Sequence, residues 1–99
     1  MAYNRTYTPG VGFQWDPRKA AANRRKHGVS FADVVGVFFD EQALTIADET
    51  KGEQRFLTVG FDVLGRLVVV AYAWQGEDIR IISARRATTR EQRSYERKR

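Results

Sequence analysis

Residue types that could move a proton or bind a phosphate group are concentrated in three short segments of the chain. Residues 24–28, RRKHG, place the only histidine behind three cations, residues 83–86 read SARR, and residues 89–96, TREQRSYE, carry an acid and a tyrosine. Metal-free cleavage of a phosphate ester needs a group that moves a proton, cations that stabilise charge on phosphorus, and an acid for the leaving oxygen. The three segments supply all of these groups.

His27 is the candidate for proton transfer, because imidazole is the side chain whose unperturbed pKa lies closest to neutral pH. Lys26, directly before it, is the neighbouring candidate for a catalytic cation. The alternative for His27 is structural: a helix-end residue that hydrogen-bonds the last carbonyls of its helix or packs under the following turn. Both roles fit a histidine that directly precedes Gly28.

Two lysines and an asparagine share one face of the helix that contains His27. At 100° per residue, Lys19, Asn23 and Lys26 form a polar stripe, which we expect to be an exposed surface. Lys19 and Lys26 are two turns apart, about 10 Å, a spacing that suits adjacent phosphates. We predict that Lys19 and Asn23 bind substrate; the alternative is a solvated face.

The last predicted strand carries three more arginines. Alternation puts Ile79, Ile81, Ser83 and Arg85 on one face and Arg80, Ile82, Ala84 and Arg86 on the other. We predict a catalytic role for Arg85 and substrate binding for Arg80 and Arg86, because a guanidinium can hold two phosphate oxygens. The alternative for Arg80 is an ion pair with Glu77 or Asp78.

The C-terminal segment offers two further groups, Glu91 and Tyr95, which are four residues apart and share a helix face. We expect Glu91 to cap the helix rather than act as a base, and we assign Tyr95 as a catalytic or base-stacking residue. The alternative for Tyr95 is packing of its ring on the sheet. Trp15 and Trp74 are expected in the core.

Charge and composition limit the class of protein. The net charge is +5 at pH 7; residues 16–28 carry five Lys or Arg against one Asp, residues 85–99 seven against two Glu, and residues 29–84 four against nine acidic residues. Basic ends of this kind indicate a surface for a polyanion. With no cysteine and one histidine, we predict no metal site and no cofactor.

The hydropathy pattern predicts an α+β fold with the element order β-α-α-β-β-β-β-α. Asp16, Pro17 and Gly28 bound a helix over 17–27, and Ser30 with Asp33 predicts a capping box for a second helix that continues to Phe39. The remaining elements are a short strand at 13–15, strands at 43–48, 55–61, 66–74 and 79–85, and a helix after a capping box of Thr88 and Glu91. We therefore expect a mainly antiparallel sheet of four to five strands, two N-terminal helices and a C-terminal helix.

Two expectations concern organisation and location. Residues 1–12 are predicted to be an irregular, flexible lead, and residues 13–99 a single domain. The longest apolar run, LVVVAYAW at 67–74, is far shorter than the about 20 residues that cross a bilayer. We expect a cytoplasmic protein without a membrane partner.

The motifs W-D-x-x-K-x-x-x-N-x-x-K-H-G-V-S-F, from Trp15, and R-I-I-S-A-R-R-A, from Arg80, resemble the BrnT-type toxins of type II toxin–antitoxin systems. The resemblance extends over residues 13–96. It implies a RelE-like fold and a small ribonuclease that inhibits translation by cutting RNA. It also implies a BrnA-type antitoxin, a ribbon-helix-helix protein that blocks the toxin and through which alone operator DNA would be bound.

Two alternatives to an active ribonuclease stay open. One is a non-enzymatic basic module that binds RNA or DNA, and the other is a protein whose basic face serves its partner after loss of activity. If the site assignments hold, Lys26→Ala and Arg85→Ala are expected to fold normally and lose toxicity.

Overall fold

A single sheet forms the framework of the protein in the computed structural model, which describes residues 4–8, 11–50 and 52–97. The sheet has six strands in the order β1-β2-β6-β5-β4-β3. Every neighbouring pair is antiparallel except β2 and β6, which run parallel. The strands are β1 (Asn4–Thr8), β2 (Val11–Trp15), β3 (Leu44–Thr50), β4 (Glu53–Phe61), β5 (Leu67–Gln75) and β6 (Asp78–Arg86).

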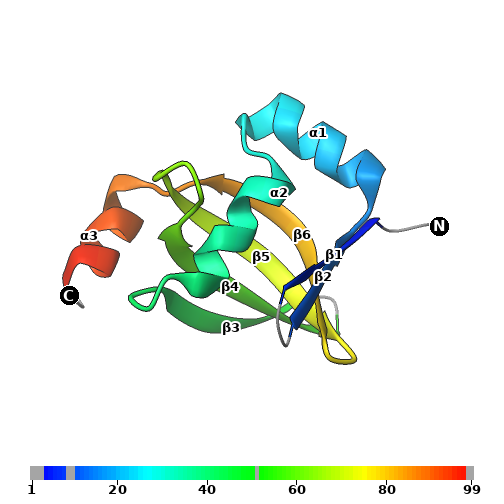
Figure 1. The fold of residues 1–99 in the computed structure, drawn as a ribbon. Helices are drawn as coiled ribbons and strands as arrows, with labels where there is room; N and C mark the ends of the chain where they lie inside the picture. The colour runs from blue at the N-terminus through cyan, green and yellow to red at the C-terminus, as the bar shows by residue number, and fades with distance from the viewer. Residues whose placement is uncertain (1–3, 9–10, 51, 98–99) are drawn as a thin grey trace.

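The helices lie on one face and at one end of this sheet (Figure 1). Helix α1 (Pro17–His27), the short helix α2 (Phe31–Val34) and the 3₁₀ helix η1 (Val35–Phe39) cover one face, and α3 (Thr89–Arg97) lies beyond the end of the sheet, next to β4. This confirms an α+β fold. None of the helices in the described ranges is long and apolar enough to span a membrane.

Strand β1 lies where an irregular lead is predicted over residues 1–12, and so corrects the prediction of irregular structure for residues 4–8. Residues 1–3, 9 and 10 of that predicted lead lie outside the described residues. The strand pairs antiparallel with β2, from Asn4 opposite Trp15 to Thr8 opposite Val11. Because its sequence, NRTYT, has one aromatic residue among polar ones, it lacks the apolar alternation by which a strand is recognised. The predicted count of four to five strands omitted this edge strand.

The second predicted helix is divided into α2 and η1. The carbonyl of Asp33 accepts a hydrogen bond from the backbone N–H of Val63, at 3.1 Å, in the turn between β4 and β5. The same turn approaches Gly36 so closely that a Cβ there would lie 2.9 Å from the Val63 nitrogen. Ser30 occupies the N-cap position, but its side chain makes no capping hydrogen bond, so the predicted capping box is wrong.

The core lies between this helical layer and the sheet. It is formed by Phe13, Trp15, Val29, Phe31, Val34, Val37, Val68, Val70, Tyr72, Ile79, Ile81 and Ala84. Trp15 is buried as predicted, whereas Trp74 is 52% exposed, contrary to prediction. Phe39 is also exposed, at 60%. Trp74 is the residue before the end of β5, and Phe39 is the last residue of η1.

A β-bulge in β6 corrects the predicted faces of that strand. Ser83 lies opposite Ala71 and Ile81 lies opposite Tyr72, so Ile82 is the extra residue. Past this residue the alternation is inverted. Ile79 and Ile81 therefore share the helix-covered face with Ala84 and Arg86, while Arg80, Ser83 and Arg85 lie together on the opposite, open face.

Candidate functional site

The segment that presents His27 is built from local signals, as predicted. The Asp16 carboxylate accepts a hydrogen bond from the backbone N–H of Arg18 at 2.9 Å, and Pro17 occupies the first turn. At the other end, Gly28 adopts φ +69°, and its N–H donates to the Arg24 carbonyl at 2.9 Å. His27 is therefore the last residue of α1, at a sharp corner before Val29.

The His27 imidazole is half-buried and makes no hydrogen bond to any other residue that the structure describes. The Arg24 carbonyl, one of the last in the helix, is bonded by the Gly28 backbone instead. A structural role in which His27 caps its own helix is therefore not observed. The ring is left with both nitrogens available to a substrate.

Asn23 corrects the prediction of an exposed polar stripe on α1. Its side chain is only 8% exposed. The amide nitrogen donates to the carbonyls of Val29, at 3.0 Å, and Ala84, at 2.8 Å, and the amide oxygen accepts from the Ala84 N–H at 3.1 Å. Because both donors and the acceptor are used, Asn23 joins α1 to β6 and has no donor left for a substrate.

Lys19 and Lys26 are exposed, as predicted for the polar stripe of this helix. No ion pair joins either of them, or Arg18, Arg24 and Arg25, to a carboxylate in the described part of the chain. In contrast, Arg55, Arg66, Arg80 and Arg85 are all paired. Helix α1 therefore carries five cations without an ion pair among the described residues: Arg18, Lys19, Arg24, Arg25 and Lys26.

Arg66 is a residue that the sequence analysis missed. Its Nε donates to the Asp62 carboxylate at 2.9 Å, its Nη2 lies 2.9 Å from the same carboxylate and 3.6 Å from that of Asp33, and its Nη1 donates to the Gly28 carbonyl at 3.3 Å. It thereby ties the β4–β5 turn to the corner beside His27. No local sequence pattern indicates this role, because it depends on the contact between residues 28 and 66, which are 38 positions apart.

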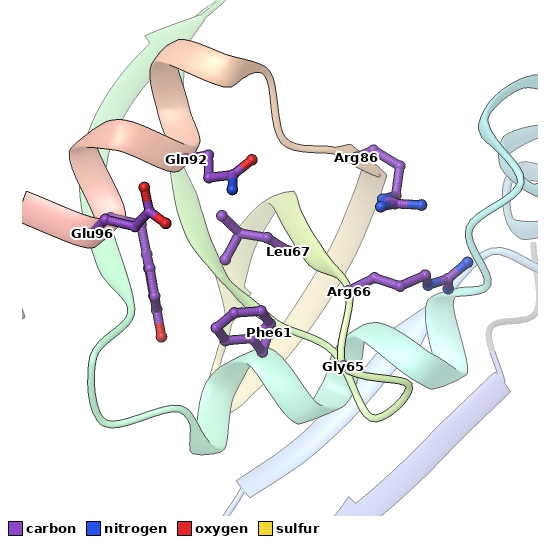
Figure 2. Close-up of a pocket in the computed structure, with 8 residues that line it drawn as sticks. Phe61, Gly65, Arg66, Leu67, Arg86, Gln92 and Glu96 are labelled. Carbon is purple, nitrogen blue, oxygen red and sulfur yellow. The ribbon is translucent and has the colours of Figure 1, made fainter.

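A pocket of about 220 Å³ opens between the β4–β5 turn, the end of β6 and α3. Its walls combine aromatic and aliphatic groups with two arginines; it is lined by Phe61, Gly65, Arg66, Leu67, Arg86, Gln92, Tyr95 and Glu96. Figure 2 shows Arg66 and Arg86 on one side of the pocket and Gln92 and Glu96 on the other. We name this cavity the terminal pocket.

Arg86, for which substrate binding is predicted, is an exposed cation that lines the terminal pocket. No carboxylate of the described residues pairs with its guanidinium, whereas Arg66 is held by Asp62. Arg86 follows Ala84, the partner of Asn23, by two residues on the same face of the sheet. The terminal pocket therefore lies at the same end of β6 as the corner that carries His27.

Arg80 points to the open face, where its ion-pair partner is Glu53 rather than Glu77 or Asp78. Its Nη2 lies 3.0 Å from the Glu53 carboxylate, which also accepts from Arg55 at 3.0 Å. The hydrogen bond from Arg55 and the charge of Arg80 lower the pKa of Glu53. This ion-pair network of β4 and β6 supports the structural alternative for Arg80 over substrate binding.

Arg85 is also paired on the open face. Its two terminal nitrogens each donate to one oxygen of the Glu91 carboxylate, both at 2.8 Å. Glu91 in turn accepts from the backbone N–H of Thr88 at 2.8 Å, and its own N–H donates to the Thr88 hydroxyl at 3.2 Å. The predicted capping box is confirmed. Because Arg85 secures α3 to β6, Arg85→Ala is now expected to loosen the helix rather than fold normally.

Acid is expected to weaken this attachment of α3. The hydrogen bonds from Arg85, followed by that from Thr88, lower the pKa of Glu91 from 4.5 to about 2. A carboxyl group whose pKa is lower in the folded than in the unfolded protein stabilises the fold at pH values above its unfolded-state pKa. This stability is lost as the pH falls from about 4.5 to about 2. The contribution should be about 1–2 kcal/mol, since the carboxylate is partly exposed.

Urea unfolding of the wild type and of Glu91→Gln across this pH range would measure that contribution. The wild type should lose it in acid, whereas Glu91→Gln should start less stable and show a flatter dependence on pH. Equal slopes for the two proteins would show that the Arg85–Glu91 pair does not stabilise the fold.

Tyr95 is buried, with 3% of its surface exposed. Its hydroxyl donates to the Asp40 carboxylate at 2.8 Å, and its ring packs edge-on against Phe61 with centroids 5.3 Å apart. Although the ring contributes to the wall of the terminal pocket, the hydroxyl is bonded to Asp40. This geometry supports the packing alternative over the predicted catalytic and stacking roles.

A second hollow, of about 190 Å³, lies on the open face beneath α3. It is lined by Leu44, Ile46, Leu57, Val59 and Val69 and by two polar residues, Glu91 and Ser94. With a carboxylate and no cation in its walls, it suits a phosphate less well than the terminal pocket does. In the described ranges, no group of three or more histidine, aspartate or glutamate side chains is arranged to hold a metal ion.

Two comparisons with known proteins agree with this geometry. Residues 15–91 match the family described as the ribonuclease toxin, BrnT, of type II toxin–antitoxin systems. The fold is similar to the 1.1 Å crystal structure of the Brucella abortus ribonuclease toxin, BrnT, with a TM-score of 0.59, 27% identity, and coverage of 76% of this chain and 94% of that one. No curated protein matches the chain. The chain belongs to the BrnT family of ribonuclease toxins.

Proposed function

We propose that this protein is a metal-independent endoribonuclease that acts in the cytoplasm and inhibits translation by cutting RNA. The observation that carries the proposal is the terminal pocket, which is lined both by Arg86, whose guanidinium has no carboxylate partner among the described residues, and by the aromatic residue Phe61. An apolar surface next to a cation suits a nucleobase and its phosphate. A RelE-like fold, with the RNA bound at the C-terminal end of the sheet, is part of the same proposal.

His27 is proposed to move the proton. It accepts a proton from the 2′-hydroxyl, whose oxygen attacks phosphorus; the bond from phosphorus to the 5′-oxygen breaks, and this oxygen takes up a proton from water. The products are a 2′,3′-cyclic phosphate and a free 5′-hydroxyl. Arg86 and Lys26 stabilise the charge that develops on the phosphoryl oxygens. His27, Lys26 and Arg86 therefore remain from the predicted site, with Lys19 as a phosphate contact outside it.

The proposed partner is a BrnA-type antitoxin with a ribbon-helix-helix domain, through which the complex would bind operator DNA. Membership of a toxin family of type II systems supports an antitoxin partner. The exposed cations of α1 suit an acidic segment of such a protein. Binding to the chain should therefore weaken as salt is added.

A non-enzymatic nucleic-acid-binding module is the second candidate. It is favoured by the structural engagement of Arg85 and Tyr95, two of the four predicted catalytic side chains. In that case the unpaired cations of α1 and Arg86 would hold RNA without cutting it.

Incubation of the purified protein with RNA in EDTA tests the proposal. We expect fragments that end in a 2′,3′-cyclic phosphate. When the protein is induced in cells, we expect protein synthesis to fall, and co-expression of the antitoxin to restore it. RNA that is bound but stays intact would support the second candidate. Cleavage that requires an added divalent cation would remove the claim of metal independence.

Lys26→Ala is expected to leave the melting temperature unchanged and to weaken RNA binding. Lys26 is exposed and without an ion pair, so its removal costs no buried contact. The slope of log Kd against log salt should fall by about 1, as for the loss of one phosphate contact. Arg25→Ala, a loss of charge on another side of α1, is the matched control. The same change in slope for both variants would indicate general attraction rather than a contact at Lys26.

A further inference from the structure

Two polar side chains hydrogen-bond the corner between α1 and α2: Asn23, on α1 itself, bonds the Val29 carbonyl, and Arg66, in the β4–β5 turn, bonds the Gly28 carbonyl. We propose that they act together as positioning residues, which hold the His27 corner in a fixed place relative to Arg86. This inference rests on the proposed function, in which His27 and Arg86 act on the same phosphodiester. Neither positioning residue needs to touch the RNA.

Asn23 joins the corner to strand β6. Its amide nitrogen bridges the Val29 carbonyl, after the corner, and the Ala84 carbonyl on β6, while its oxygen accepts the Ala84 N–H. This arrangement needs two donors and an acceptor on one short planar group, which only asparagine provides at this length. Aspartate would keep the acceptor but place a buried negative charge against two carbonyl oxygens.

Arg66 holds the corner from the side of the β4–β5 turn. Its guanidinium is fixed by Asp62, whose buried carboxylate also accepts the backbone N–H groups of Leu64 and Arg66 itself, both at 2.9 Å. From this fixed position, Nη1 donates to the Gly28 carbonyl at 3.3 Å. The Arg66 side chain therefore connects the β4–β5 turn to Gly28, the residue that follows His27.

The two contacts hold consecutive carbonyls, those of Gly28 and Val29: Arg66 from the β4–β5 turn, and Asn23 from α1, where its amide is itself bonded to Ala84 of β6. The Ala84 partner of Asn23 is two residues before Arg86, so the clamp that fixes the corner also fixes its distance from the substrate-binding arginine. Because a catalytic group must be placed to within a fraction of an ångström, a small displacement of His27 lowers the rate strongly. The clamp is thus built between the two groups that must cooperate.

The test compares Asn23→Asp and Arg66→Lys with Arg55→Gln as a matched control. Arg55 is also an arginine in an ion pair, but on the open face, away from the corner. All variants are assayed at a temperature at which circular dichroism shows them folded. For Asn23→Asp and Arg66→Lys we expect kcat to fall about 10- to 100-fold with KM within about 3-fold of the wild-type value. Arg55→Gln should stay within about 2-fold in both.

The NMR signals of the His27 ring provide a readout that does not depend on cleavage. In both corner variants they should shift and broaden, and they should stay unchanged in Arg55→Gln. The double variant should lose less activity than the two single losses multiplied together, since both act on one corner. Arg66→Lys retains the charge near Asp62 and gives a second chance of a folded protein if Asn23→Asp unfolds.

The outcomes separate this inference from the proposed function. If the wild type cleaves RNA and His27→Ala does not, the proposed function stands. Folded corner variants with the wild-type kcat, or with unchanged His27 signals, would then overturn the positioning role alone. A rise in KM without a fall in kcat would also overturn it, because it would indicate a direct contact with RNA.

Discussion

His27→Ala is expected to lower the rate of RNA cleavage by about 10²- to 10⁴-fold, the range of general acid–base catalysis. The imidazole makes no hydrogen bond within the described structure, so its removal should take away proton transfer without leaving a buried group unpaired. The melting temperature and the affinity for RNA should stay close to those of the wild type. Single-turnover cleavage of a labelled oligonucleotide over a range of pH measures the effect.

The control for this variant is Ser30→Ala, on the other side of the same corner. The Ser30 side chain makes no capping hydrogen bond, so its loss should leave both stability and cleavage unchanged. Cleavage by His27→Ala at the wild-type rate would remove His27 from the mechanism. A loss of binding together with a lower melting temperature would instead assign it to packing at the end of α1.

The local structure around His27 could be predicted from the sequence because its determinants are local. An acceptor at Asp16, a proline at the first position and a glycine after the last turn each act within a few residues of the helix end. The same holds for Thr88 and Glu91 at the start of α3. For these elements, the sequence neighbourhood contains every interaction that decides the conformation.

Where the predictions failed, the deciding contact was distant in sequence. Helix α2 ends early because Val63 takes the Asp33 carbonyl, and Asn23 is buried because Val29 and Ala84 lie around it. The bulge at Ile82 has no sequence pattern of its own in an isoleucine-rich strand, yet it decides which face carries Arg85 and which carries Arg86.

The pairing of cations was equally hard to predict, and it changes the candidate site. The acidic middle of the chain supplies partners for three arginines, Glu53 for Arg55 and Arg80 and Asp62 for Arg66. Glu91 of the C-terminal segment pairs with the fourth, Arg85. A count of charges cannot tell a paired guanidinium from a free one. Only the fold separates Arg86 from its neighbour Arg85.

That distinction makes Arg86→Ala the second variant with a large expected effect. If Arg86 donates to the phosphoryl oxygens, its loss should lower kcat by about 10²- to 10³-fold, as for the loss of one donor in an oxyanion site. Because the guanidinium is exposed and without an ion pair among the described residues, the free energy of unfolding should change by less than about 0.5 kcal/mol. Steady-state cleavage and urea unfolding measure the two quantities.

Arg86→Lys and Arg90→Ala separate the possible reasons for such a loss. Lysine keeps the charge but not the planar guanidinium, so kcat of Arg86→Lys should lie between those of Arg86→Ala and the wild type. If the role of Arg86 were purely electrostatic, Arg86→Lys would recover the wild-type kcat more fully. Arg90→Ala removes an exposed charge of α3 that does not line the terminal pocket, and it should retain wild-type kcat. If Arg90→Ala and Arg86→Ala lose activity equally, only the total positive charge at this end of the molecule matters. The terminal pocket would then not be the place where the phosphodiester is cut.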